Sequence, residues 1–309
     1  MKVIATTTIN EPTKSLIKYS ELQDWKLIVA GDTKTPQDSF KSIDCLYLSP
    51  YYQEISYPVL SNYIGWNCIQ RRTFAILEAL RLGAEVIALV DDDNYPYDFW
   101  GNGLLVGKRI IADCYTPLGN VFDPLVVTEN NRLWHRGYPI DSLQERNCVS
   151  KKSVEIIPDI QVNLWNGSPD IDAIENICFD SPKVIFKDDI FPYTSNRLNT
   201  FNSQNTIIKR NVFKDYFLFP HIGRLDDIFA SWCVSAKGYS VVYDKASVYH
   251  DRNSHSYIKD LQDEFMGYKF GSITPKRIQN EPDLFLSDTL PERSRLAFEE
   301  YRRIIVDYV

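Results

Sequence analysis

Three consecutive carboxylates, Asp91, Asp92 and Asp93, follow an uninterrupted apolar run within residues 86–94. Five apolar residues in a row are typical of a strand buried on both faces, as in a parallel sheet. The acids then lie at the carboxyl end of that strand, where open α/β sheets bind ligands. Two carboxylates one residue apart can share a hard divalent cation that water and substrate phosphates complete. The segment predicts a metal-dependent site for a nucleotide-sugar, and the alternative is an acidic, solvated turn.

The N-terminal segment predicts a strand, a helix and a second strand, over residues 2–9, 15–22 and 25–30. This order indicates a right-handed βαβ unit that opens a parallel sheet, so both strands end beside the acidic triplet. Asp32 is a candidate acceptor for the edge of a nucleotide base, and its alternative role is to cap the turn after Gly31. The ligand-binding residues that we expect in these two turns are Thr7, Thr8, Asn10, Glu11, Asp32 and Lys34.

Two arginines occur in a helix predicted over residues 62–82, whose apolar stripe includes Ile69 and Ile76. Arg72 borders this stripe and is a candidate diphosphate contact, because a guanidinium binds phosphate oxygens in pairs. Arg71 is predicted to point about 100° away from it. We include Arg71 and Arg72 among the ligand-binding residues. The alternative is a pair of arginines whose stems lie on the core while their charges stay in water.

A second acidic pair, Asp226 and Asp227, follows Gly223 at the start of a helix predicted to run through residue 236. The helix dipole favours acids in a first turn, which is the structural interpretation. A glycine loop can also bring backbone close to a ligand, which is the functional one. Asp170 could cap a helix over residues 171–177, which is its structural interpretation. His250 directly follows a last strand predicted over residues 239–249, where a structural role is the alternative to metal binding.

Composition and missing signatures exclude several classes of protein. A net charge of −7 argues against nucleic-acid binding, so we expect no nucleic-acid partner. Six scattered cysteines without a Cys-x-x-Cys pair or zinc spacing are typical of a reduced, cytoplasmic protein. No run approaches the ~18 apolar residues of a membrane span, so we expect at most peripheral membrane association. The sequence also lacks a dinucleotide-binding Gly-x-Gly-x-x-Gly motif, a P-loop, a Gly-x-Ser-x-Gly elbow and His-Glu-x-x-His.

Four motifs occur in order along the chain. The first two are the Arg-Arg-x(10)-Gly-Ala pattern of residues 71–84 and the Val-Asp-Asp-Asp-Asn that follows at 90–94. The other two are Trp-Asn-Gly-Ser-Pro-Asp-Ile-Asp-Ala at 165–173 and Asn-Ser-Gln-Asn-Thr at 202–206. Together they resemble the STELLO-type glycosyltransferases of plants, and the match extends over most of the chain.

A second set of segments comprises Arg-Gly-Tyr-Pro at 136–139, Pro-Asp-Ile-Asp-Ala at 169–173 and Gly-Arg-Leu-Asp-Asp at 223–227. These segments are similar to the reversibly glycosylated polypeptides, which are UDP-arabinopyranose mutases. Tyr249 and His250 stand where that family has Trp-His. The resemblance to the mutases is thin across the N-terminal half.

Both resemblances imply an α/β protein with the GT-A, or nucleotide-diphospho-sugar transferase, fold. We expect a mixed, mostly parallel central sheet flanked by helices over residues 1–258. Residues 259–309 are expected to form a partly helical C-terminal extension, with a loop-like middle at 274–291, that packs on the same domain. The implied ligands are a UDP-sugar donor, Mn²⁺ or Mg²⁺, and a glycan or lipid-linked acceptor.

The resemblances also imply roles for particular residues. Asp91, Asp93 and His250 match the metal ligands, Asp92 lies with the donor, and Arg136 matches the arginine that the mutases glycosylate. The leading hypothesis is a metal-dependent glycosyltransferase. If it inverts the anomeric centre, it needs a carboxylate base, for which we choose Asp227 or Asp226, with Asp170 in reserve. The alternatives are a UDP-sugar mutase and a non-catalytic scaffold that binds a sugar nucleotide.

Overall fold

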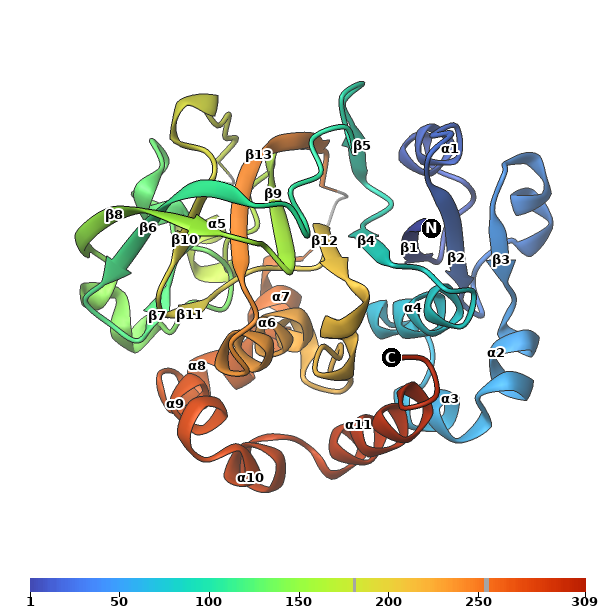
Figure 1. Cartoon of the computed structure of the whole chain (residues 1–309). Coiled ribbons are helices and arrows are strands. Elements are labelled where there is room, and N and C mark those ends of the chain that lie inside the picture. The colour runs from blue at the N-terminus through green and yellow to red at the C-terminus, as the bar shows by residue number, and fades with distance from the viewer. Residues whose placement is uncertain (180–181, 253–255) are drawn as a thin grey trace.

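A single mixed sheet organises the computed structural model, which describes residues 1–179, 182–252 and 256–309 (Figure 1). Its strand order is β3-β2-β1-β4-β12-β9-β13-β10-β6-β8, and β5 pairs with β13. The strands of this sheet are β1 (Lys2–Thr8), β2 (Lys26–Gly31), β3 (Leu46–Leu48), β4 (Val86–Val90), β5 (Asn94–Pro96), β6 (Ile110–Pro117), β8 (Cys148–Ile156), β9 (Ile160–Gly167), β10 (Tyr193–Ser195), β12 (Asn205–Lys209) and β13 (Val241–His250). Two short strands, β7 (Val121–Phe122) and β11 (Leu198–Asn199), pair separately. The predicted α/β class with a mixed sheet is confirmed.

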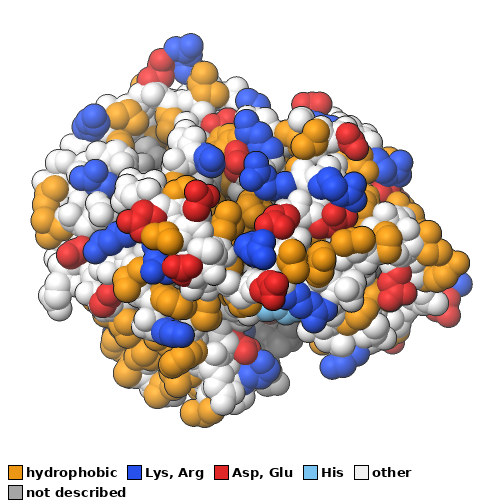
Figure 2. All heavy atoms as spheres, turned by 90° about the horizontal axis from the view of Figure 1, so that it is seen from below, with side chains coloured by type: hydrophobic (Ala, Val, Ile, Leu, Met, Phe, Trp, Pro, Cys, Tyr) orange, Lys and Arg blue, Asp and Glu red, His pale blue; other side chains and the backbone are white. Residues whose placement is uncertain are grey.

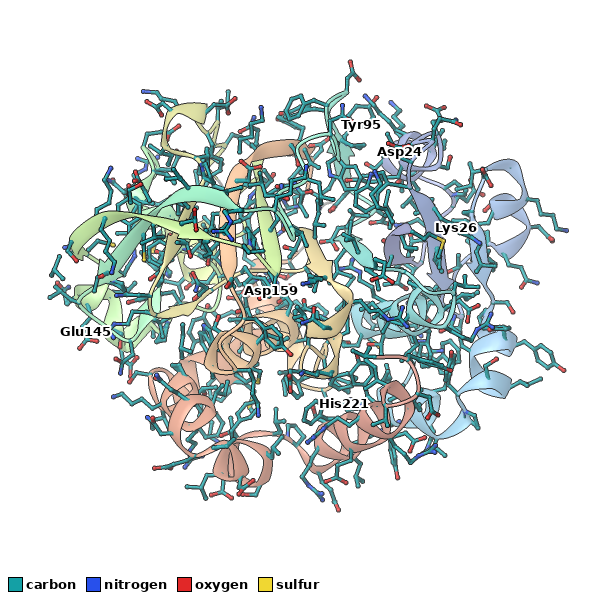
Figure 3. The ribbon with its side chains drawn as sticks, viewed as in Figure 1. Asp24, Lys26, Tyr95, Glu145, Asp159 and His221 are labelled. Atoms are coloured by element: carbon teal, nitrogen blue, oxygen red, sulfur yellow. The ribbon has the colours of Figure 1, made fainter. Side chains whose placement is uncertain are left out.

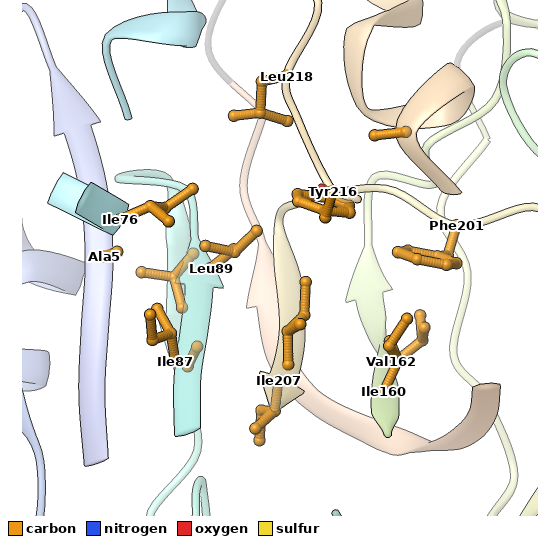
Figure 4. Packing of buried hydrophobic residues seen from close by; sticks show 14 of the residues in the cluster. Ala5, Ile76, Ile87, Leu89, Ile160, Val162, Phe201, Ile207, Tyr216 and Leu218 are labelled. Carbon is orange, nitrogen blue, oxygen red and sulfur yellow. The ribbon is translucent and has the colours of Figure 1, made fainter. Parts of the chain in front are cut away.

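The N-terminal strands of the sheet form an all-parallel block. β3, β2, β1 and β4 are all parallel, so the turns after β1, β2 and β4 meet at one edge, as predicted. β4 is buried over its last four residues, but β12 enters antiparallel on its other side. Beyond β12 the pairings alternate in direction, with β9 and β13 again parallel. Figure 4 shows the apolar packing along these strands, including Ile87 and Leu89 of β4 and Ile207 of β12.

Helices cover the sheet. They are α1 (Lys14–Ser20), α2 (Pro50–Ser56), α3 (Pro58–Ile64), α4 (Arg72–Arg81), α5 (Ala173–Cys178), α6 (Asp226–Ala236), α7 (Tyr257–Asp263), α8 (Phe265–Phe270), α9 (Ile273–Asn280), α10 (Pro282–Leu284) and α11 (Glu292–Ile305). Of these, α4 packs on β1 and β2, and α1 lies beside β5. In Figure 1, α8 to α11 run along the lower side of the molecule.

The continuous helix predicted over residues 62–82 is wrong. The chain leaves α3 at Gly65, whose φ is +80°, turns again at Asn67, whose φ is +58°, and starts α4 at Arg72. Asp32 stabilises this break, because its Oδ2 accepts hydrogen bonds from the backbone N–H groups of Asn67 (2.7 Å) and Cys68 (3.3 Å). A buried acceptor distant in sequence therefore offsets the helical preference of the segment.

The C-terminal segment is helical in the region predicted to be loop-like, since α9, α10 and a π-helical turn over Phe285–Thr289 occupy most of residues 274–291. Phe217, Phe285 and Tyr301 belong to one aromatic cluster that joins this segment to the core. The Tyr301 hydroxyl donates to the Phe213 carbonyl at 2.8 Å. The predicted domain division at residue 258 stays a prediction.

Figure 2 views the molecule from below, where Lys and Arg side chains are interspersed with Asp and Glu. Among the described residues, no helix is both long enough and apolar enough to cross a membrane. The cytoplasmic location expected from the cysteines stays a prediction.

Candidate active site

The three acids after β4 have three different environments. Asp91 forms an ion pair with Arg72, whose side chain is fully buried. Asp92 accepts hydrogen bonds from the Thr8 hydroxyl and from Asn10 Nδ2, so it ties the turn after β1 to the end of β4. Asp93 lies 3.6 Å from His250 Nε2. Burial raises the pKa of Asp91 and of Asp92, and Arg72 offsets only part of that effect at Asp91.

Asp93 and His250, two of the predicted metal ligands, face each other. The Nδ1 of His250 lies 2.7 Å from the Ser168 carbonyl, so Nδ1 carries the proton of the neutral ring. That tautomer leaves the lone pair of Nε2 facing Asp93, as outer hydrogen bonds do for metal-ligating histidines. Burial lowers the pKa of His250, but the neighbouring Asp93 outweighs it, so the pKa is raised.

The predicted metal ligands do not form a closed cage. Within residues 1–179, 182–252 and 256–309, no three His, Cys, Asp or Glu side chains converge as a ready-made metal site. Asp91 is withdrawn toward Arg72, which leaves Asp93 and His250 as the facing pair. Two protein ligands fit a cation whose remaining positions are filled by water and phosphate oxygens, as Mg²⁺ sites commonly are.

A second cluster of charged side chains consists of Arg136, Asp170 and Asp227, and Arg136 joins its two carboxylates. Its Nε and Nη2 donate to both oxygens of Asp170, at 2.8 and 2.9 Å, and its Nη1 and Nη2 donate to Asp227 at 3.1 to 3.2 Å. The guanidinium also donates to the Arg224 carbonyl. Burial would raise the pKa of Asp170, but Arg136, His135 and Arg224 together hold it well below its ordinary value. The predicted capping role of Asp170 is wrong, because Asp172 caps α5 instead by accepting from the Glu175 N–H at 2.9 Å.

Ser203 connects the two clusters. Arg72 Nη1 donates to the carbonyl and hydroxyl oxygens of Ser203, at 2.8 and 2.9 Å. Asp227 Oδ2 accepts from the N–H and the hydroxyl of the same residue, at 2.9 and 3.1 Å. A continuous chain of hydrogen bonds and ion pairs therefore runs from Asp91 to Asp170, through Arg72, Ser203, Asp227 and Arg136. Residues 202–206 are one of the motifs of the resemblance to STELLO proteins, but no role was predicted for Ser203.

Asp226 has a different environment from its neighbour. Its Oδ2 accepts a hydrogen bond from Gln70 Nε2 at 2.9 Å, and the side chain is buried. Burial, followed by the charge of Asp227, raises the pKa of Asp226 to about 7. A carboxylate with that pKa can accept a proton near neutral pH, as a general base must. Gln70 was not predicted, because it is 156 positions away in sequence.

These groups line a cavity of ≈ 240 Å³. Its lining residues are Ile69, Asp91, Asp93, Arg136, Asp170, Ser203, Gln204, Gly223, Arg224, Asp226, Asp227, His250 and Arg252. The structure thus brings together the predicted metal ligands, the predicted acidic pair, the reserve base and Arg136. Arg224 and Arg252 were not assigned a role from the sequence. Both pair with Asp260 of α7, at 2.9 and 3.1 Å.

The other predicted ligand-binding residues lie outside this cavity. Arg71 does not point away from the core as predicted. It is fully buried, donates to Gln53 Oε1 and to the Ser61 hydroxyl, and lies 3.5 Å from the centre of the Trp66 ring. Asp32 is also buried and fills the capping role, since Oδ1 accepts from the Thr33 N–H at 2.6 Å.

The other predicted ligand-binding residues lie in or beside the turns that follow β1 and β2. Thr7 donates to the Ala30 carbonyl at 2.6 Å, which links the ends of β1 and β2. Glu11 and Lys34 are exposed. Contact of Thr7, Glu11 and Lys34 with a nucleotide stays a prediction.

No protein-family model matches the chain. Two curated proteins of Arabidopsis thaliana are similar to it, and both are named probable glycosyltransferases. STELLO2 is 22% identical over 187 residues and STELLO1 is 25% identical over 193, in each case over 56% of this chain. The match spans only 24% of the length of either relative. The resemblance to STELLO proteins is confirmed, while the resemblance to the mutases stays a prediction.

Solved structures of glucosyl-3-phosphoglycerate synthase from Mycobacterium tuberculosis are also similar to the chain. The complex with phosphoglyceric acid has a TM-score of 0.47 and 10% identity, and the match covers 90% of this chain and 79% of that one. The complex with Mn²⁺, UDP-glucose and glycerol 3-phosphate has a TM-score of 0.46 and 12% identity at the same coverage.

Proposed function

We propose that the chain is a metal-dependent glycosyltransferase of the GT-A type that moves a sugar from a UDP-sugar to a hydroxyl acceptor. The proposal rests on one observation: the candidate metal ligands and the candidate base line the same cavity. Asp93 and His250 face each other as a metal-binding pair, and Asp226, whose pKa is about 7, lines the same space. The similarity to two proteins named probable glycosyltransferases supports it.

Asp93 and His250 would hold Mn²⁺ or Mg²⁺, with ligand oxygens completing the coordination. When bound, the metal supplies positive charge against the leaving diphosphate. Carboxylate and imidazole ligands together favour Mn²⁺ over Mg²⁺, because imidazole nitrogen is the softer donor. Arg72 pairs with Asp91 and also contacts Ser203, just before the start of β12, which leaves Asp93 as the carboxylate beside His250.

Asp226 is the better base of the acidic pair. Asp227 accepts hydrogen bonds from Arg136 and Ser203 on both oxygens, and such contacts stabilise its charged form. Asp226 would take the proton of the acceptor hydroxyl as its oxygen bonds to the anomeric carbon. The bond from that carbon to the diphosphate breaks at the same time, so the diphosphate leaves with its electron pair.

The structure favours transfer over the mutase alternative. A glycosylated arginine needs a guanidinium nitrogen free to attack a sugar. Every side-chain nitrogen of Arg136 donates to Asp170, Asp227 or the Arg224 carbonyl. The two carboxylates outweigh the effect of burial and raise the pKa of Arg136 well above its ordinary value, so the group stays protonated.

The test incubates the protein with UDP- and GDP-sugars, with and without Mn²⁺, and identifies products by mass spectrometry and NMR. We expect free UDP from one donor, only with metal, and its loss in Asp93→Asn. Asp24→Asn, on a side chain that is 83% exposed and outside the cavity, serves as the matched control. An isomerised UDP-sugar without free UDP would favour the mutase, and binding without any product would favour the scaffold.

A further inference from the structure

A second, larger cleft opens beside the candidate active site. It measures ≈ 840 Å³ and shares Asp93 with the inner cavity. One wall comes from the turn after β1 and the start of α1, with Thr13 and Lys14. The other comes from β5 and the end of β13, with Tyr95 and Tyr249. The inner cavity lies below the size of about 300–1,000 Å³ that is usual for ligand sites, so it holds only part of the reacting molecules.

Two tyrosines face this cleft from neighbouring strands. Tyr95 and Tyr249 are directly opposite in the antiparallel pairing of β5 with β13, which places their side chains on one face of that pair. They remain 41% and 40% exposed. The Lys18 ammonium lies 4.7 Å from the centre of the Tyr95 ring and is itself held by Asp98 at 2.7 Å. Tyr95 lies near α1 at the top of Figure 3.

The cleft is pre-formed, because its walls are tied to the acidic segment. Thr13 donates its hydroxyl to the Asp92 carbonyl, and Asn10 Nδ2 donates to the Asp92 carboxylate at 3.0 Å. On the other wall, the Asp251 N–H donates to the Asp93 carbonyl at 3.2 Å. A ligand therefore meets a shaped surface and loses little free energy to ordering it.

We propose that this cleft binds the acceptor, and that the acceptor is a carbohydrate whose pyranose rings lie on Tyr95 and Tyr249. This inference rests on the proposed function and names its substrate class. A pyranose has an apolar C–H face that suits an aromatic ring and hydroxyls that suit charged groups such as Lys14 and Asp251. The shared Asp93 places one end of such a ligand at the inner cavity, where Asp226 lies.

The polar groups of the cleft do not suit the other stacking ligand, a nucleotide base. Recognition of a base edge requires fixed donors and acceptors with free capacity. Asn10 and Asp92 are the predicted nucleotide contacts that reach the cleft, and they already bond to each other. Asp32, the predicted base contact, does not line it.

The experiment measures oligosaccharide binding by calorimetry and saturation-transfer NMR in the presence of UDP and Mn²⁺. The probes are cellotetraose and maltotetraose. We expect one of them to bind the natural chain, and the double variant Tyr95→Ala, Tyr249→Ala to bind it at least about tenfold more weakly. The Kd of UDP should change by less than about twofold. Tyr51→Ala, on a side chain of α2 that is 73% exposed and outside both cavities, is the matched control.

Three outcomes would overturn the proposal: neither probe binds, the double variant binds the probe as the natural chain does, or UDP binding weakens with sugar binding. The last would assign the cleft to the nucleotide. Failure of the proposed function looks different. In that case the tyrosines would bind oligosaccharide while no donor releases UDP.

Discussion

Arg136 neutralises two buried carboxylates at once, and this pairing decides what each of them can do. Asp170 and Asp227 are each held by its planar fork, while Asp226, one residue away, is not. A planar guanidinium can bridge two carboxylates in a way that a lysine ammonium cannot. The residue that resembles a glycosylated arginine thus holds the acidic cluster together and keeps Asp226 distinct from its neighbour.

At the residue scale, Arg136→Lys should destabilise the protein. Breaking a buried, hydrogen-bonded ion pair costs about 3–5 kcal/mol, because a charge is left uncompensated. A lysine keeps one positive charge but cannot bridge both carboxylates, so one of them is left unpaired. We therefore expect the free energy of unfolding to fall by about 3 kcal/mol in urea titrations. Arg109→Lys, in an exposed ion pair with Glu155, should change it by under about 1 kcal/mol. Equal effects of the two substitutions would contradict this account of Arg136.

The base assignment predicts a pH profile. Asp226 must be ionised to accept a proton, so kcat/KM should rise with pH and level off above its pKa of about 7. Gln70 donates to the carboxylate and stabilises the charged form. Gln70→Leu should therefore raise this pKa and move the rising limb to higher pH. If the rising part of the kcat/KM profile does not move in Gln70→Leu, or persists in Asp226→Asn, then a group other than Asp226 controls it.

At the scale of elements, three segments distant in sequence converge at the cavity. β4 ends in the acidic triplet, α6 begins at Asp226, and α7 packs on the loop before α6. Gly223 makes this last contact possible, since a Cβ there would lie 1.8 Å from the Asp263 carbonyl oxygen. The close packing keeps Asp260 of α7 beside Arg224.

Gly223→Ala should displace α7 from the site. Gly238→Ala is the matched control, because both glycines have positive φ, +65° and +85°, but Gly238 has open space around it. In both variants, placing alanine at a positive φ costs about 1–2 kcal/mol of backbone strain. Only Gly223→Ala adds a clash, so its free energy of unfolding should fall further, and hydrogen exchange in residues 257–263 should accelerate. Similar losses without faster exchange would show that the contact is unimportant.

At the scale of the whole molecule, buried carboxyls give stability an unusual pH dependence. Burial, with Asp172 nearby, raises the pKa of Glu175 to about 10. Its Oε1 accepts from the Trp134 N–H at 2.7 Å. The folded chain thus keeps a proton that the unfolded chain releases above about pH 4.3. Stability must fall as pH rises from the unfolded pKa toward the folded one.

Glu175→Gln tests this effect, because glutamine resembles the protonated acid but does not titrate. Urea unfolding between pH 5 and pH 9 should show the variant gaining stability relative to the natural chain as pH rises. Glu21→Gln, on an exposed side chain, should run parallel to the natural chain. A constant difference between Glu175→Gln and the natural chain across that range would mean that Glu175 is ionised in the folded state.

Local pattern was enough to predict the elements that carry the site. An apolar run of five residues predicted β4, and the strand–helix–strand order predicted the parallel start of the sheet. The acidic start of α6 was predicted where the structure has it, because a first helical turn favours acids. Strand direction placed the turns after β1 and β2 beside Asp91, whereas only the motif resemblance implied that Asp226 and His250 belong to the same site.

The pairing of charges was decided only by the tertiary structure. Arg72 meets Asp91 and Ser203, Arg136 meets Asp170 and Asp227, and no local pattern distinguishes these pairs from others of the same charge. The same holds for Asp32, whose hydrogen bonds to residues 67 and 68 break a helix that periodicity favours. Periodicity reports which side of an element is buried. Which charge a buried group meets depends on chain segments far away in sequence, because desolvation makes each such group bind a partner wherever the fold supplies one.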